Sequence, residues 1–394
     1  MRIALTGATG LLGRNLLFEI LKQNLNNLNN LEILILYRPK DNTQASDRIE
    51  EIITNDGLDY LKANTDILPN ILKSIHTISF DLLKDNLSIS LNDFKVLMNG
   101  KISYFFHVAA LTDFRSGKGI EQKLYDTNVA GTNRVINLIK SLNNIDETVY
   151  IGSAYSCGSK TGNVKPNYSN LNESFRNPYE KSKLEAELMF LDYMKNNNIR
   201  HKVFRPTTIC GRLIESPLGS TNKYDVFYSW IAFFLREKFN IIGNINKIYT
   251  EPIDMPIRLH YSPVGGLNII PADYAAKIIY NVCVNQDNDI NYHLASHTIT
   301  SNEFIGKEAL RSLNINGATF VLEEPADKNR LEKLYYKTVG KIFIQYQIGE
   351  PILFDISNLS KFHKRSKLSC PEITKMNFSY LMEYGKHDYF GVKV

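Results

Sequence analysis

The stretch of sequence that decides the fold is Arg2-Ile3-Ala4-Leu5-Thr6-Gly7-Ala8-Thr9-Gly10-Leu11-Leu12-Gly13. Arg2–Thr6 is typical of a buried strand, and a helical pattern begins at Leu11. The glycines between them have a GxxGxxG spacing. Glycine permits a tight turn and a close approach of backbone N–H groups to a pyrophosphate, and the helix N-terminus adds free donors and a positive dipole end. The stretch therefore predicts a dinucleotide site made by Gly7, Thr9, Gly10, Leu11, Leu12 and Gly13.

Working outward, short apolar runs alternate with helical patterns through the first half of the chain. The expected strands are residues 2–6, 32–37, 75–80, 102–108, 148–153 and 201–205, with a helix over residues 11–25. Near-continuous apolar strands separated by amphipathic helices favour a parallel sheet covered on both faces. We therefore predict an α/β fold with a doubly wound, Rossmann-type parallel sheet.

The alternation of apolar runs and helical patterns ends at about residue 206. Long loops are expected at residues 217–223 and 251–266, and prolines and aromatic residues become more frequent. We predict a dinucleotide-binding domain over residues 1–206, its sheet completed by part of residues 265–300. Residues 207–394 are expected to form a smaller, mixed substrate-binding region.

The residues after the second expected strand indicate which dinucleotide is bound. An acidic residue there would bind the ribose hydroxyls of NAD, but the sequence continues Tyr37-Arg38-Pro39-Lys40. Arg38, together with Arg14 and Lys40, could neutralise a 2′-phosphate. The alternative is ordinary surface charge. We predict NADP(H).

Tyr179-Glu180-Lys181-Ser182-Lys183 contains a YxxxK spacing in a helical pattern that begins near Pro178. The spacing places Tyr179 and Lys183 on one helix face, where a lysine cation lowers the pKa of a phenol and holds a cofactor ribose. The expected strand over residues 148–153 delivers Ser153, whose hydroxyl could hold a substrate oxygen against Tyr179. Ser153, Tyr179 and Lys183 are the predicted catalytic residues.

Composition narrows the functional class. The 394 residues carry a formal net charge of +5, with 43% hydrophobic and 22% charged residues, an ordinary globular composition that does not suggest nucleic-acid binding. The four cysteines are far apart and predict neither disulfides nor a metal site. A strand begins within two residues of the start, and no apolar run reaches ~18 residues. We therefore expect no signal peptide, no membrane span and a cytoplasmic location.

Positive charge is concentrated near the end, in Lys361-Phe362-His363-Lys364-Arg365-Ser366-Lys367. One interpretation is a solvated basic face. The other is a docking patch for an anionic partner such as an acidic carrier protein, a CoA or a phosphate.

Together these motifs resemble the extended short-chain dehydrogenase/reductase superfamily over residues 1 to about 300. Phe80-Asp81-Leu82 resembles the segment whose aspartate contacts adenine, and His107-Val108-Ala109-Ala110 resembles the element that passes under the cofactor. Asn128-Val129-Ala130-Gly131-Thr132 resembles the helix whose asparagine supports the active site, and Arg205-Pro206-Thr207 resembles the loop near the nicotinamide. The resemblance implies cofactor contacts by Asp81, Leu82, Ala109, Ala110, Lys183, Pro206 and Thr207, with Asn128 in support.

Within that superfamily the sequence is similar to thioester reductases and fatty acyl-CoA reductases, which have the male sterility type of NAD-binding domain. Gly152-Ser153-Ala154-Tyr155 stands where they have a STAY motif, and Ile270-Pro271-Ala272-Asp273-Tyr274 resembles their VPVDY element. Phe354-Asp355-Ile356-Ser357-Asn358 resembles an FD-x-x-N segment of acyl reductases. The resemblance implies NADPH-dependent reduction of an acyl group bound to a carrier protein or CoA, to an aldehyde or an alcohol, and a possible homodimer.

Other functions stay open at this point. The same residues suit a ketone or aldehyde reductase of the dihydroflavonol-reductase or hydroxysteroid-dehydrogenase type. A nucleotide-sugar epimerase or dehydratase is disfavoured, because those enzymes hold NAD tightly and want an acidic residue after the second strand. A non-catalytic nucleotide sensor is disfavoured by the intact Ser/Tyr/Lys set.

Overall fold

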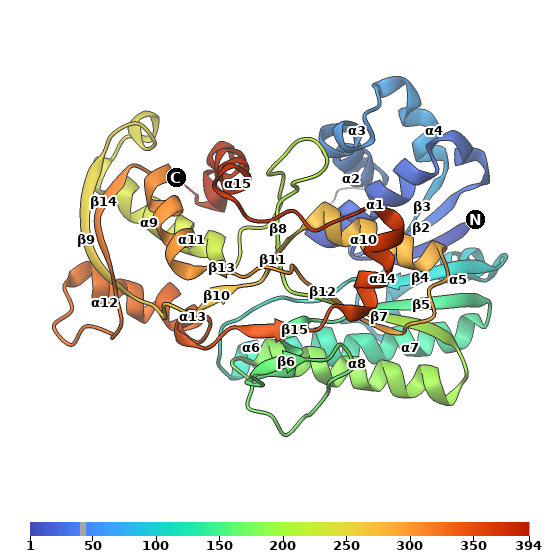
Figure 1. Cartoon of the computed structure of the whole chain (residues 1–394). Helices are drawn as coiled ribbons and strands as arrows, with labels where there is room; N and C mark the ends of the chain where they lie inside the picture. The colour runs from blue at the N-terminus through green and yellow to red at the C-terminus, as the bar shows by residue number, and fades with distance from the viewer. Residues whose placement is uncertain (40–44, 394) are drawn as a thin grey trace.

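The computed structural model describes residues 1–39 and 45–393. Seven parallel strands form its central sheet, in the order β12-β7-β5-β4-β1-β2-β3 (Figure 1). They are β1 (Arg2–Thr6), β2 (Glu32–Tyr37), β3 (Ile75–Ser79), β4 (Ile102–His107), β5 (Ile145–Ile151), β7 (Arg200–Pro206) and β12 (Asn291–Leu294). The strand order reverses between β1 and β4, as in a doubly wound sheet. The predicted Rossmann fold class is confirmed.

Helices cover both faces of this sheet because successive side chains of a strand point to opposite sides. Ile3 and Leu5 of β1 pack into the core beneath α1 and α10, whereas Ala4 packs into the core beneath α7 and α8. Figure 1 shows the two layers on opposite sides of the strands. The bounds are α1 (Leu11–Gln23), α10 (Ala272–Val284), α14 (Ser357–Ser366), α5 (Leu91–Met98), α6 (Lys118–Leu124), α7 (Gly131–Leu142) and α8 (Pro178–Asn196).

Between β2 and β3 the chain forms a segment of short helices. It comprises α2 (Ala45–Ile52), the π-helix η2 (Ile53–Gly57), α3 (Leu58–Leu61), the short helix η3 (Thr65–Ile67) and α4 (Leu68–Lys73). Between α1 and β2 the chain forms the 3-10 helix η1 (Leu25–Asn30).

A second hydrophobic core holds the remaining helices together at the other end of the molecule (Figure 1). Its helices are α9 (Phe227–Ile242), α11 (Asn302–Ser312), α12 (Arg330–Lys337), α13 (Val339–Ile348) and α15 (Lys375–His387). They pack around a two-stranded sheet of β9 (Ile253–His260) and β14 (Ile315–Val321). The boundary between domains at residue 206 stays a prediction.

The prediction of a long loop over residues 251–266 is wrong, because β9 occupies half of that range. Met255, Ile257 and Leu259 are buried and alternate with more exposed residues, which is the two-residue period of a strand. Pro256 obscured that pattern. A proline is compatible with β9 because this strand pairs with β14 along one edge only within the described sheet.

Short strand pairs connect the two ends of the molecule. Parallel β8 (Thr208–Cys210) and β11 (Ile269–Pro271) are one pair, and antiparallel β10 (Gly266–Leu267) and β13 (Thr300–Ser301) are another. Near the C-terminus, β15 (Ile352–Phe354) pairs with β6 (Gly162–Val164).

In the basic segment of residues 361–367, His363 forms a hydrogen bond with the Tyr274 hydroxyl of α10 at 2.8 Å. No helix in residues 1–39 or 45–393 is long and apolar enough to cross a membrane.

Candidate active site

A cavity of about 740 Å³ opens at the carboxyl ends of β1, β4 and β5. This is where ligands bind in open α/β sheets, at the point where the strand order reverses. Most of the predicted site residues line it: Gly7, Thr9, Gly10, Leu11, Leu12, Gly13, Arg38, Asp81, Leu82, Ala109, Ala110, Ser153, Tyr179, Lys183, Pro206 and Thr207. Arg14 and Asn128 are predicted residues that do not.

The glycine turn has room for nothing larger than glycine at two positions. Gly7 has a φ of +75°, and a Cβ there would lie 2.8 Å from the Ala109 backbone nitrogen. At Gly13, a Cβ would lie 2.1 Å from the Gly7 carbonyl oxygen. Glycine at these positions brings β1, α1 and the chain after β4 close together, and it leaves the backbone N–H groups accessible to a phosphate. The turn therefore fits the pyrophosphate of a dinucleotide.

The two arginines predicted for a 2′-phosphate lie in different surroundings. Arg38 is exposed and lines the cavity at the end of β2. Arg14 is turned away, and its Nη1 lies 3.4 Å from Asp56 Oδ2. Burial lowers the pKa of Arg14, with Asp56 opposing the shift. Lys40 lies outside the described residues. Of the two, Arg38 is thus the arginine that lines the cavity.

Ser153 and Tyr179 come together at the bottom of the cavity. Ser153 follows β5, and Tyr179 is in the first turn of α8, whose N-terminus is capped by the Asn177 side chain accepting from the Glu180 N–H at 3.1 Å. Burial raises the pKa of Tyr179 to about 12, while hydrogen bonds from Thr112 and Ser153 oppose this rise. The phenol is therefore protonated at neutral pH and can donate a proton.

Lys183 lies one turn further along α8. Its Nζ donates to the Ile151 carbonyl oxygen at 2.7 Å and to the Tyr150 hydroxyl at 3.1 Å. Burial lowers the pKa of Lys183 to about 8, and Glu187 opposes that shift. The expected lowering of the phenol pKa is not found in this structure, because burial of Tyr179 outweighs the effects that would stabilise a phenolate.

Asn128 supports the site from beneath. It lies in the π-helix η5 (Tyr125–Ala130), which joins α6 to α7. Its Oδ1 accepts from the Leu111 N–H at 2.8 Å, and its Nδ2 donates to the Leu111 carbonyl at 2.9 Å and to Ser182 Oγ at 3.0 Å. These bonds join the loop after β4 to the helix that carries Tyr179.

Aromatic side chains from distant parts of the sequence make the apolar half of the cavity. Phe114 packs edge-on against Tyr179 with ring centroids 5.3 Å apart, and against Phe343 of α13 at 5.8 Å. Tyr155 and Tyr346 also line the cavity, in a T-shaped pair 5.6 Å apart. Our sequence reasoning missed Thr112, Phe114 and Phe343. Thr112 and Phe114 lie shortly after the His107-Val108-Ala109-Ala110 segment. No local sequence signal pointed to Phe343 of α13.

Comparison with known proteins identifies the family of this chain. Residues 5–279 match the NAD-binding family described as male sterility protein. The chain belongs to this family. The resemblance to extended short-chain dehydrogenase/reductases of the thioester reductase type is confirmed. Fatty acyl-CoA reductase 1 of Mus musculus is 29% identical over 159 residues, which are 40% of this chain and 29% of that protein. The chain thus spans under a third of that relative's length.

Solved structures share the fold of this male sterility family chain. The terminal R domain from the myxalamid PKS-NRPS biosynthetic pathway superposes with a TM-score of 0.72 at 19% identity, over 99% of this chain and 91% of that domain. UDP-glucuronic acid 4-epimerase from Bacillus cereus, in complex with NAD, gives 0.60 at 17% identity over 100% and 99% of the two chains.

Other reactive side chains near the site have structural partners. His107 bridges Thr6 Oγ1 at 3.0 Å and Thr132 Oγ1 at 3.2 Å, and burial lowers its pKa to about 3. Burial raises the pKa of Cys157 to about 12, so its thiolate is not available near neutral pH. Across the described part of the chain, no three His, Cys, Asp or Glu side chains gather as a metal site requires.

Proposed function

We propose that this protein is an NADPH-dependent reductase of acyl thioesters, with Ser153, Tyr179 and Lys183 as its catalytic residues. The observation that carries the proposal is the meeting of Ser153 and a protonated Tyr179 in the cavity that also contains the glycine turn. A hydride donor held by that turn would reach a carbonyl placed against the two hydroxyls.

The preference for NADP(H) over NAD(H) rests on the end of β2. Arg38 lines the cavity there, and the residues on either side of it are Tyr37 and Pro39 rather than an acidic residue. A guanidinium binds a 2′-phosphate through charged hydrogen bonds, whereas a carboxylate would repel it. Asp81 lies further along, at the end of β3, where the family resemblance implies a contact with adenine.

The proposed chemistry uses both hydroxyls as donors. The cofactor, when bound, supplies a hydride to the thioester carbonyl carbon. Ser153 and Tyr179 donate hydrogen bonds to the carbonyl oxygen as it gains negative charge. Cleavage of the C–S bond then gives an aldehyde and a thiol, so that one thioester, one NADPH and one proton are consumed. In a second round, Tyr179 would give its proton to the aldehyde oxygen and an alcohol would form.

The nature of the substrate is inferred from the cavity wall and the relatives. Phe114 and Phe343 offer an apolar surface next to Tyr179, which suits an acyl chain. The relative in Mus musculus is named for the reduction of fatty acyl-CoA. We propose an acyl group delivered as a CoA or carrier-protein thioester, for which the exposed Lys364 and Lys367 of the basic segment would be favourable docking contacts.

The test is NADPH oxidation by the purified protein with acyl-CoA and acyl-carrier thioesters, with products identified by mass. We expect turnover that Tyr179→Phe abolishes. Tyr125→Phe is the matched control, because Tyr125 is 51% exposed on η5 and its loss should leave the rate unchanged. Turnover of free ketones or aldehydes, but of no thioester, would reject the proposal in favour of a carbonyl reductase acting on free substrates.

A further inference from the structure

A segment from the second half of the chain crosses over the glycine turn. Residues 211–226 connect β8 to α9 without a helix or strand of their own. Near its tip, Asn222 Nδ2 donates to the Thr9 carbonyl oxygen at 2.9 Å. The three residues Lys223, Asp225 and Val226 line the same cavity as Gly7–Gly13. The segment therefore faces the place where the turn would hold a pyrophosphate.

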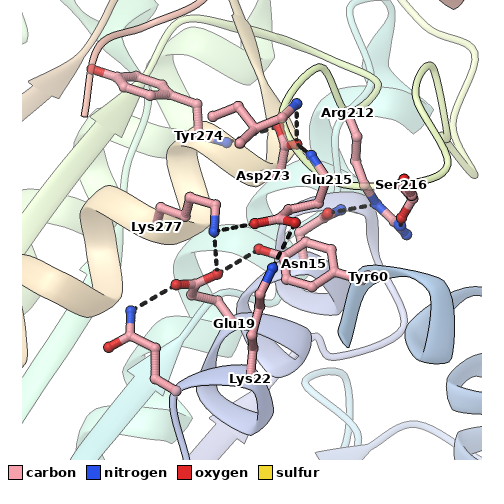
Figure 2. A network of polar contacts seen from close by, with 12 residues as sticks. Asn15, Glu19, Lys22, Tyr60, Arg212, Glu215, Ser216, Asp273, Tyr274 and Lys277 are labelled. Carbon is pink, nitrogen blue, oxygen red and sulfur yellow. Dashed lines mark hydrogen bonds and ion pairs between the residues drawn. The ribbon is translucent and has the colours of Figure 1, made fainter. Parts of the chain in front are cut away.

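The base of this segment is fixed by a buried carboxylate of α10. Asp273 is fully buried and accepts from the backbone N–H groups of Leu213 at 3.3 Å, Ile214 at 2.7 Å and Glu215 at 2.7 Å. The Glu215 carboxylate in turn lies 2.6 Å from Lys22 Nζ and 2.7 Å from Lys277 Nζ. Figure 2 shows these contacts joining α1, α10 and the segment.

A buried arginine makes a second anchor on the nucleotide-binding side. Arg212 donates to Asn15 Oδ1 of α1 at 3.0 Å and to the Ser216 carbonyl at 2.9 Å (Figure 2). It also pairs with Asp56 of η2, which accepts from Ser220 Oγ at 3.0 Å. Residues 212–220 are thus fixed at several points to the half of the molecule that carries the glycine turn.

The contacts around Asp273, Glu215 and Arg212 together form one anchor for the segment, in which positive and negative charges balance one another. The carboxylates of Glu19, Asp56, Glu215 and Asp273 face the cations Arg14, Lys22, Arg212 and Lys277, or backbone N–H groups. Buried ions are stable only when they are paired in this way. Each of these four cations has a carboxylate partner within the described residues, and the cation that the segment itself places at the cavity is Lys223 near its tip.

Lys223 is held in a position from which it can change partners. Its Nζ lies 2.8 Å from Asp225 Oδ2, and its side chain remains 41% exposed. Thr221 fixes its backbone, because the Thr221 hydroxyl accepts from the Lys223 N–H at 3.2 Å and donates to its carbonyl at 3.0 Å. The charge of Asp225 also reaches Tyr179, adding to the effect of burial on its pKa. The pair thus lines the cavity that also contains the glycine turn and Tyr179.

We propose that Lys223 is a ligand of the dinucleotide's pyrophosphate, opposite the glycine turn, and that Asp225 holds it in place until the phosphates arrive. This inference rests on the proposed function, because it requires that the protein binds NADP(H). An exposed ion pair is weak, and a pyrophosphate has two charged groups to offer the lysine in exchange.

The experiment is a calorimetric titration of the full chain with three ligands: NADP⁺, 2′-phospho-ADP-ribose and adenosine 2′-monophosphate. Only the first two contain a pyrophosphate. Lys223→Met should weaken binding of those two by roughly ten-fold, the effect of one lost charged hydrogen bond, and leave the third unchanged. Asp225→Asn should strengthen pyrophosphate binding, because it frees the lysine. Lys247→Met is the control, since Lys247 makes a comparable exposed ion pair away from the cavity.

The other outcomes overturn the inference. An equal loss for all three ligands would mean that Lys223 supports the fold of the site. An unchanged affinity for NADP⁺, together with weaker binding of an acyl-CoA, would assign the lysine to a substrate phosphate. If the unmodified protein bound no NADP⁺ or NAD⁺, the proposed function itself would fail. Binding of NADP⁺ that is unaffected by Lys223→Met would overturn only the role of Lys223.

Discussion

Removing the charge of Glu187 should destabilise this protein far more than removing a neighbouring charge on the same helix. Glu187 and Arg205 are both almost completely buried, and the Arg205 Nε and Nη2 atoms lie 2.5–3.1 Å from the Glu187 carboxylate oxygens. Arg205 Nη1 also donates to the Tyr168 carbonyl at 2.6 Å. Glu187→Gln leaves the guanidinium buried without a counter-charge. Such a loss costs about 3–5 kcal/mol of unfolding free energy.

A matched control lies on the same helix. Glu185 and Lys181 form an exposed pair 3.8 Å apart, and pairs of this kind contribute about 0.3–0.5 kcal/mol, so Glu185→Gln should be nearly neutral. A double variant with methionine at positions 187 and 205 should recover much of the loss, because it removes both buried charges.

The assay is urea denaturation followed by circular dichroism. Circular dichroism is preferable to tryptophan fluorescence because the single tryptophan, Trp230, lies in the other hydrophobic core. If Glu187→Gln cost no more than Glu185→Gln, the buried pair would not have the importance that its geometry suggests. If the double variant were as unstable as Glu187→Gln alone, the loss would come from packing and not from the unpaired charge.

Two further predictions concern the cofactor. Arg38→Ser should weaken NADPH binding by about ten-fold or more and leave NADH binding unchanged, measured by fluorescence titration, because one or more charged hydrogen bonds are lost. Equal losses for both cofactors would contradict the assigned contact. For Lys183, burial lowers the pKa from 10.5 to about 8, so the cation is lost as the pH rises through about 8. NADPH affinity should fall across that range, and Lys183→Met should show a flat profile.

The protonation of Lys183 affects protein stability with the opposite sign to its effect on NADPH affinity. Between about pH 8 and 10.5 the unfolded chain keeps the lysine proton that the folded chain has lost, so the contribution of Lys183 to stability rises with pH there. At neutral pH the buried ammonium lowers stability. The difference in unfolding free energy between the unmodified protein and Lys183→Met, followed over pH in the absence of cofactor, isolates this contribution from those of the cysteines, whose pKa values are raised by burial. It also separates the destabilising effect of burial from the expected role in binding.

Local rules explain what could be predicted from the sequence. The bounds of β1 and β2 follow from unbroken apolar runs that end at glycine or charged residues, and the start of α8 follows from Asn177 and Pro178 at its N-terminus. The glycine turn needs no tertiary information, since its conformation depends on Gly7 and Gly13 themselves.

What could not be predicted depends on partners distant in the sequence. Arg14 was a candidate for a phosphate contact beside Arg38 until Asp56, from the helical segment between β2 and β3, proved to hold Arg14. The pKa of Tyr179 could not be predicted from the YxxxK spacing, because its burial depends partly on Phe114 in the loop after β4. Likewise, Pro256 obscured a strand whose partner begins only at residue 315.

Under the proposed function, α13 links catalysis to substrate selection. The Tyr346 hydroxyl donates to Glu180 Oε1 at 2.5 Å and accepts from Asn177 Nδ2 at 2.8 Å. It therefore bonds to residues on both sides of Tyr179 at the N-terminus of α8. On the same helix, Phe343 packs against Phe114, which contacts the Tyr179 ring. One helix from the second half of the chain thus forms part of the substrate wall and also fixes the N-terminus of α8. It follows that residues 207–394 cannot be exchanged for those of a relative to change the substrate alone. The exchanged region must also bring a partner for Glu180 and Asn177, because these residues flank Tyr179, the proposed catalytic tyrosine, in the first turn of α8.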